Sequence, residues 1–124
     1  EKLKTFIHNI AHTVDKHHHP APIMMRELAS GTRDFPEVAG QDLARIVSIL
    51  TAILKEGEKK GVFIKTNPLL IHMMIVGTTI FYKMSAPIRT KQTIFPKSLR
   101  KLDKHVSGNR DKEIEKLLLK VLIK

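Results

Sequence analysis

The stretch Ile53–Pro68, ILKEGEKKGVFIKTNP, decides the fold of this 124-residue chain. Gly57 and Gly61 interrupt a long amphipathic pattern, and glycine commonly ends a helix. Asn67 then offers a side-chain cap, and Pro68 stands in the first helical turn, where no N–H is needed. The stretch therefore predicts the end of one helix, a short break and the start of a second helix.

Apolar residues recur at spacings of three and four on both sides of this break, which is the pattern of helices with one buried face. The segment that begins at Pro68 is apolar nearly all round, so it must be covered on two sides. We expect no strand. The prediction is an all-α bundle of about five helices in a single domain over residues 1–124, with helices over 1–18, 22–30, 36–60, 68–84 and 111–124.

The composition narrows the kind of protein. The chain has no cysteine, which excludes disulfides and thiolate metal sites and agrees with a cytoplasmic protein. Its formal net charge of +10 favours approach to polyanions. The longest apolar run, Leu69–Tyr82, is shorter than the roughly 20 residues that span a bilayer, so we expect no membrane association.

The sequence of the break resembles a motif in the ligand-binding domains of TetR/AcrR-type transcriptional regulators. In that family, an E-G-x-x-x-G-x-F-x-x-x-(D/N)-P segment joins two core helices. The matching positions here are Glu56, Gly57, Gly61, Phe63, Asn67 and Pro68. Residues 25–31, MRELASG, resemble a second sequence motif of that family, R-E-L-A-x-G. The resemblance covers roughly residues 1–86.

This resemblance implies the C-terminal effector-binding and dimerisation domain of a transcription factor, usually a repressor, that binds DNA through a separate N-terminal helix-turn-helix domain. The chain begins at Glu1, already inside a helical pattern, so we expect that domain to precede it. A homodimer is expected through the last two helices of each subunit, and the surplus apolar surface of both helices independently favours it. The expected interface residues are Ile71, Met74, Thr78, Ile114, Leu117, Leu118, Val121 and Leu122.

By the same resemblance, a small apolar or anionic amphiphilic effector binds in a cavity between the first, third and fourth helices. We expect the cavity to be lined by residues whose helix faces should point inward. These are Phe6, Ile10, Met25, Leu28, Ile46, Leu50, His72, Met73 and Val76.

Histidines are frequent near the N-terminus. His8, His12 and Asp15 follow one another at helical spacing, which could hold zinc or nickel. That stripe lies nearly opposite the apolar face of its helix, so we expect it to meet solvent or a neighbouring element. His72, in an apolar run, forms a polar stripe with Thr79 and Lys83, which we expect in the core or an interface. We predict no metal and no cofactor.

The connector between the last two predicted helices, residues 86–110, is long and basic. Residues 83–104 hold seven Lys or Arg and one acid. They form either a solvated connector with a short helix over 97–105, or a basic patch for an acidic partner or a phosphate-bearing ligand. Phe95 is the one aromatic residue in residues 86–110, so base stacking on RNA is not expected.

Motifs of catalysis are missing from the sequence, including G-x-S-x-G, H-E-x-x-H and glycine-rich phosphate loops, so we do not expect an enzyme. Besides the regulator, two hypotheses remain. One is a helical protein-interaction module whose basic connector binds an acidic partner. The other is a metal- or haem-binding bundle that uses His8 and His12, or His72.

Overall fold

The structure, a computed structural model, describes residues 1–16, 20–31, 37–91 and 93–124. Over these ranges the chain forms seven helices and no strand, which confirms the predicted all-α fold. The helices are α1 Lys2–Lys16, α2 Pro20–Ala29, α3 Glu37–Lys59, α4 Pro68–Met84, α5 Ala86–Arg89, α6 Lys97–Val106 and α7 Arg110–Leu122.

The predicted helix boundaries agree closely with the observed ones where both are described. The prediction of about five helices was too low, because residues 86–110 contain α5 as well as α6, which was expected as a short helix. α2 also begins two residues before its expected start at position 22. The expected end of the first helix and start of the third fall at 17–19 and 36, outside the described residues.

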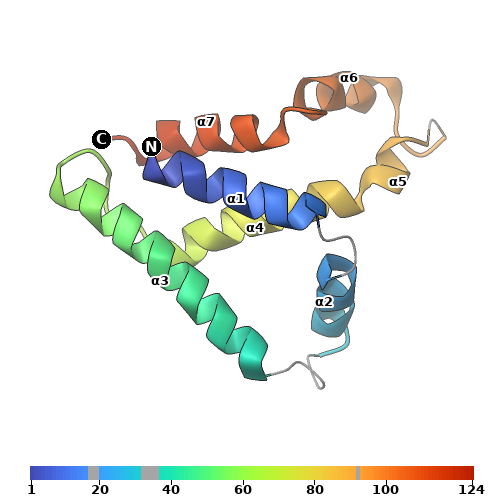
Figure 1. The fold of residues 1–124 in the computed structure, drawn as a ribbon. Helices are drawn as coiled ribbons and strands as arrows, with labels where there is room; N and C mark the ends of the chain where they lie inside the picture. Colours follow the sequence, from blue (N-terminus) through green and yellow to red (C-terminus); the bar gives the residue numbers. More distant parts are fainter. Residues whose placement is uncertain (17–19, 32–36, 92) are drawn as a thin grey trace.

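α1 lies at the centre of the fold and packs against α3, α4 and α7 (Figure 1). α4 also contacts α3 and α7, so it is covered from several directions. α6 and α7 follow one another along one edge of the molecule, at the top of Figure 1, whereas α2 stands at the end of α1. The two chain termini lie close together beside the loop between α3 and α4.

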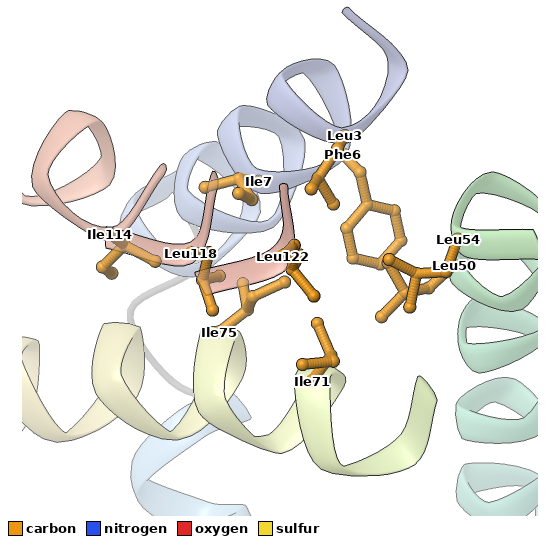
Figure 2. Close-up of a cluster of buried hydrophobic side chains, with 10 residues drawn as sticks. All are labelled: Leu3, Phe6, Ile7, Leu50, Leu54, Ile71, Ile75, Ile114, Leu118 and Leu122. Atoms are coloured by element: carbon orange, nitrogen blue, oxygen red, sulfur yellow. The ribbon is translucent and has the colours of Figure 1, made fainter. Parts of the chain in front are cut away.

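The core is built from one apolar stripe on each of the four packed helices (Figure 2). Each stripe repeats at spacings of three or four residues, so its members share one helix face. Leu50, Ile75 and Leu122 are completely inaccessible to solvent. The full cluster comprises Leu3, Phe6, Ile7, Leu50, Leu54, Ile71, Ile75, Ile114, Leu118 and Leu122.

The break between α3 and α4 follows the sequence prediction. Gly61 has φ +74°, a conformation that favours glycine, and the Gly57 carbonyl accepts hydrogen bonds from the next backbone N–H groups, those of Val62 and Phe63. The Asn67 side chain accepts a hydrogen bond of 2.9 Å from the Leu69 N–H, as a helix cap does.

The same break holds the C-terminus. The Ile64 N–H donates to the Leu122 carbonyl at 2.8 Å, and the Lys124 N–H donates to the Val62 carbonyl at 2.9 Å. These two bonds join the end of α7 to the loop that precedes α4. The break therefore fixes the position of the last helix as well as the angle between α3 and α4.

Gly57 leaves room for the Phe63 ring, so replacing it with alanine is expected to destabilise the fold. An added Cβ would lie 2.1, 2.6 and 2.8 Å from three atoms of that ring. Overpacking of this kind costs about 1–3 kcal/mol, against the gain of about 1 kcal/mol from alanine's helix propensity. Urea unfolding should show a lower midpoint for Gly57→Ala.

Gly40→Ala is the matched control, because Gly40 is also in α3 and has no atom within 4 Å of its added Cβ. That variant is expected to gain about 0.5–1 kcal/mol. Equal stabilisation of both variants would mean that the Phe63 ring moves aside freely, and the close contact would then not matter.

Candidate functional site

α4 exposes large apolar side chains that nothing in the described chain covers. Its opposite face is buried through Ile71, Ile75 and Thr79, whereas Phe81 is 71% exposed. Large exposed apolar side chains that recur along one helix mark a surface for association. The exposed apolar residues of α4 are Leu69, Leu70, Met73, Met74, Phe81 and Met84.

α7 adds two exposed apolar side chains, Leu117 and Val121, which are 63% and 60% exposed. Asp111 and Glu115 of α7 face α1, since both contact His8. At about 100° per residue, Leu117 and Val121 lie roughly 120° away from that side. They are therefore turned away from α1.

The exposed residues of α4 are turned the same way. The Lys83 ammonium donates hydrogen bonds to the carbonyls of Val14 and Asp15, so the Lys83 side of α4 faces α1. Met74 and Phe81 lie roughly opposite that side on the helix. We use the name apolar face for the exposed residues of both helices that point away from α1: Leu70, Met74, Gly77, Phe81, Leu117 and Val121.

A cavity of about 640 Å³ lies at the C-terminal end of this face. Gly77, Thr78 and Phe81 line it from α4, so the cavity and the apolar face share residues. The volume falls within the range of about 300–1,000 Å³ that is typical of small-molecule pockets. Its other lining residues are Tyr82, Ser85, Ile88, Arg89 and Phe95.

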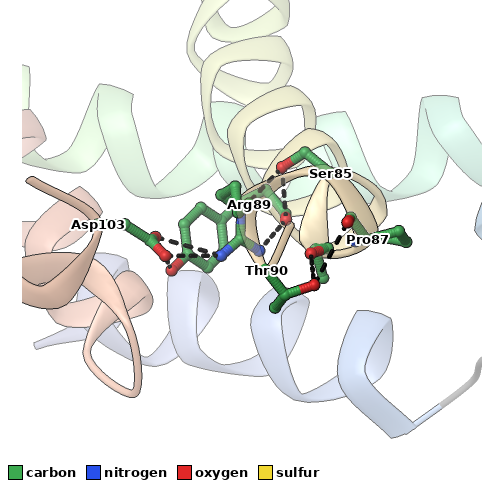
Figure 3. A network of polar contacts seen from close by, with 7 residues as sticks. Ser85, Pro87, Arg89, Thr90 and Asp103 are labelled. Atoms are coloured by element: carbon green, nitrogen blue, oxygen red, sulfur yellow. Dashed lines mark hydrogen bonds and ion pairs between the residues drawn. The ribbon is translucent and has the colours of Figure 1, made fainter. Parts of the chain in front are cut away.

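One wall of the cavity is held by a polar network around Arg89 (Figure 3). The guanidinium lies 3.6 Å from the centre of the Tyr82 ring, and its Nη1 lies 3.2 Å from each carboxylate oxygen of Asp103. Nη2 donates to the Tyr82 carbonyl at 2.6 Å, and Nε donates to the Ser85 hydroxyl at 3.0 Å. The Tyr82 hydroxyl donates to Asp103 at 2.6 Å. The network thus joins α4, α5 and α6.

The charges of this wall are balanced. Asp103 neutralises Arg89, and both side chains are largely buried, with exposed fractions of 20% and 13%. Burial raises the pKa of the Tyr82 phenol above its ordinary value of 10.0, and the hydrogen bond to Asp103 raises it further, so the phenol stays neutral. A ligand in this cavity would meet apolar walls and a paired charge.

A second cavity of about 420 Å³ lies between the start of α1 and α3, where Phe6, Ile49 and Ile53 meet Lys2 and Asn9. Beside it, Lys2 pairs with Glu56 at 2.8 Å. Hydrogen bonds from Lys2 and Lys60 lower the pKa of the Glu56 carboxyl to about 2. Glu56 remains ionised, which ties the first turn of α1 to the end of α3.

The nine residues predicted to line an effector cavity are not brought together around either of these two. The smaller cavity includes Phe6, and neither includes the other eight. Met25, Leu28 and Met73 are exposed, with more than a third of each side chain accessible. The rest are buried or half-buried among α1, α3 and α4: Phe6, Ile10, Ile46, Leu50, His72 and Val76.

The eight residues predicted for a dimer interface divide into two groups. Four belong to the core within the chain, because α7 packs against its own α1 and α4: Ile71, Ile114, Leu118 and Leu122. Four are exposed and remain available to a partner: Met74, Thr78, Leu117 and Val121. The apolar face thus retains three of the eight predicted residues, Met74, Leu117 and Val121. It adds Leu70, Gly77 and Phe81, which the sequence analysis did not select.

The N-terminal histidine stripe meets a neighbouring helix, as expected. The His8 Nδ1 atom lies 2.5 Å from Asp111 and its Nε2 atom lies 3.1 Å from Glu115, while Arg110 pairs with Asp15 at 2.9 Å. His8 thus joins α1 to α7, and His12 is exposed. Among the residues that the structure describes, no group of three or more His, Asp or Glu side chains is placed to hold a metal ion.

His72 is buried, and its burial predicts a pH dependence of stability. Desolvation lowers the pKa of its imidazole below the ordinary value of 6.5. The unfolded chain therefore takes up a proton that the folded chain resists, and His72 lowers stability progressively as the pH falls below about 6.5. Unfolding free energies of wild type and His72→Leu should differ increasingly in favour of the variant between neutral and acidic pH.

His12→Gln is the control for that comparison, because it removes an exposed histidine. It shows whether the loss of any one histidine produces the same pH dependence. Parallel pH profiles of wild type and His72→Leu would contradict the prediction.

No described helix combines the length and the apolar character needed to cross a bilayer. Comparisons of the chain with models of known protein families, with curated proteins and with solved structures give no match.

Proposed function

We propose that this chain is the dimerisation and effector-binding domain of a cytoplasmic TetR-type transcriptional regulator, with a repressor as the expected type. The observation that carries the proposal is the apolar face, together with the cavity that opens beside it. The two residue patterns that resemble the family favour the same function. DNA is read, in this proposal, by a helix-turn-helix domain outside residues 1–124.

The helices and residues that make up the apolar face support homodimerisation. Two helices contribute to it, and a second copy would bring two more, which makes the four-helix arrangement of many helical interfaces. Gly77 stands at its middle and lets another helix approach closely. Phe81 provides the kind of large aromatic anchor on which interfaces depend.

The cavity supports a small, largely apolar effector. Because Arg89 is already paired with Asp103, an uncharged ligand would leave that pair intact, whereas an anionic one would compete with it. A ligand there would touch Phe81 and Gly77, which also belong to the apolar face. If the ligand bound two arrangements of the dimer with different affinities, effector binding would be coupled to DNA binding.

Sedimentation velocity tests the interface through Phe81→Glu. Wild type is expected to sediment as a dimer and the variant as a monomer. Circular dichroism should show that the variant is folded. Losing an aromatic anchor costs about 2 kcal/mol or more, and it is lost twice in a two-fold interface, so the dissociation constant should rise roughly a thousand-fold.

Val38→Glu is the control, since Val38 is 58% exposed on α3, away from the apolar face. This variant should remain a dimer. A wild type that is monomeric at all concentrations, or a Phe81→Glu variant that dimerises like wild type, would contradict the proposed interface. Native mass spectrometry of wild type then tests for a releasable organic ligand.

A second candidate is a helical interaction module that binds an acidic partner through its basic connector. It is favoured by exposed cations in residues 86–110, among them Lys91, Lys97, Lys101 and Lys104. This candidate predicts a monomer without a ligand and binding that weakens with salt. The sedimentation experiment separates it from the regulator.

A further inference from the structure

α7 carries a stripe of lysines that has no partner within the described chain. Lys112, Lys116 and Lys120 follow one another at intervals of four residues, so they lie on one side of the helix. All three are exposed, and none makes an ion pair or hydrogen bond with a described residue. That side is turned away from the core residues Ile114 and Leu118.

α6 continues the pattern. Lys97 and Lys101 are exposed on the side of α6 roughly opposite Asp103, which faces α4 and α5, and Lys104 is exposed about 100° from Asp103. They too have no partner among the described residues. α6 and α7 follow one another along one edge of the molecule (Figure 1), and we use the name basic edge for the six exposed lysines of these two helices.

Three of the four acids of these two helices contact other parts of the chain. Asp103 binds Arg89 and Tyr82, Asp111 and Glu115 contact His8, and the remaining acid, Glu113, accepts a hydrogen bond from Asn109. At about 100° per residue, however, Glu113 lies on the lysine side of α7, about 60° from Lys116 and about 20° from Lys120. The basic edge carries six lysines against this one acid, so it keeps an excess of positive charge with which to bind an anion.

The lysines carry an energetic cost for the isolated chain. Like charges four residues apart on a helix destabilise it. A polyanion along the edge would reverse the sign of that contribution. Its binding would also release condensed counterions, which provides most of the affinity of lysine for nucleic-acid phosphates.

The chemistry of the edge distinguishes among polyanions. The side of α6 that carries the lysines also holds Ser98 and His105, and the exposed Leu99 and Leu102 lie on another side of that helix. α6 and α7 contain no Phe, Tyr or Trp, the residues that provide most stacking on unpaired bases. Evenly spaced point charges suit a regular phosphate backbone.

We propose that the basic edge of α6 and α7 binds the sugar-phosphate backbone of duplex DNA without reading its sequence. The contact is electrostatic, with each lysine neutralising about one phosphate. The inference does not rest on the proposed dimer or effector, because the six lysines lie outside the apolar face and outside both cavities.

Fluorescence anisotropy with a labelled duplex of arbitrary sequence tests this at several salt concentrations. Wild type should bind more tightly at low salt, with equal affinity for a second, unrelated duplex. The triple variant Lys112→Gln, Lys116→Gln, Lys120→Gln should bind about ten-fold or more weakly at low salt. The slope of log K against log salt should fall in magnitude by about 3.

A matched control removes the same charge elsewhere. The triple variant Lys16→Gln, Lys55→Gln, Lys59→Gln changes exposed lysines of α1 and α3. At about 0.15 M salt it should bind DNA within about two-fold of wild type, since exposed charges more than about 8 Å from the DNA are then largely screened. Circular dichroism confirms that both variants are folded.

Three results would overturn the proposal. The control variant could lose as much affinity as the α7 variant, which would reduce the effect to net charge. Wild type could bind anionic phospholipid vesicles but not the duplex, which would assign the edge to a membrane. It could also bind polyglutamate more tightly than the duplex at equal salt, which would assign the edge to an acidic protein segment. Sedimentation of Phe81→Glu keeps the result separate from the dimer, because that variant should retain DNA binding as a monomer.

Discussion

Replacing Leu122 with alanine is expected to lower the free energy of unfolding by about 2–5 kcal/mol, because the side chain is fully buried where α7 meets the rest of the core. A cavity there also weakens the end of the helix, whose Leu122 carbonyl accepts a hydrogen bond from Ile64. Domains of this size are stable by only about 5–15 kcal/mol. Urea unfolding followed by circular dichroism should therefore show a much lower midpoint.

Leu102→Ala is the control for this substitution. Leu102 is 65% exposed on α6, outside the apolar face, so its truncation should change stability by less than about 0.5 kcal/mol. Comparable losses in the two variants would mean that Leu122 is not packed as the structure places it. A loss in Leu122→Ala that depends on protein concentration would point instead to a contact between subunits.

The parts of the fold that were predictable from the sequence have local causes. Asn67 and Pro68 begin α4 through a cap and a fixed φ, and Gly61 ends the preceding turn through its positive φ. These signals act within a few residues, so they can be read without knowing the tertiary structure. The same is true of the spacing of apolar residues in α1, α3 and α7.

The sequence could not show which side of α4 or α7 faces its own chain. Both helices have more apolar residues than one contact needs, and a helical period alone treats Leu117 and Leu118 alike. Tertiary packing separates them, since Leu118 is 4% exposed and Leu117 is 63% exposed. For this reason, half of the residues predicted for the dimer interface lie in the core.

The polar wall of the larger cavity could also not be predicted from the sequence. Its key contacts join Tyr82 and Arg89 to Asp103 across 21 and 14 residues, within a segment that looked like a basic connector. No periodic pattern links such positions. The network joins three different helices, so it can be recognised only in the folded structure.

α7 combines three roles on three sides of one helix. Leu118 packs in the core, Leu117 lies on the apolar face, and Lys116 lies on the basic edge. Residues that are adjacent in sequence therefore enter different parts of the proposals. Single substitutions at these positions can test stability, dimerisation and DNA binding separately, which a deletion of the helix could not do.

Replacing Asp103 with alanine is expected to release α6 from the bundle while leaving the core folded. α6 has no buried residue, and Asp103 joins it to α4 and α5 through its contacts with Tyr82 and Arg89. Hydrogen bonds to charged groups contribute about 1.5–3 kcal/mol, so amide hydrogens of α6 should exchange roughly ten- to a hundred-fold faster. The overall unfolding midpoint should change far less.

The single tyrosine of the chain provides a second measurement. Burial and the hydrogen bond to Asp103 both raise the pKa of Tyr82, whereas the charge of Arg89 lowers it. Removing Asp103 leaves Arg89 unbalanced, so ultraviolet titration should show a lower tyrosine pKa in Asp103→Ala than in wild type. Asp42→Ala is the control, because it removes the same charge from an exposed pair with Arg45 on α3. Unchanged exchange in α6 and an unchanged tyrosine titration in Asp103→Ala would show that α6 is held by its apolar contacts, and the wall of the cavity would then not depend on this carboxylate.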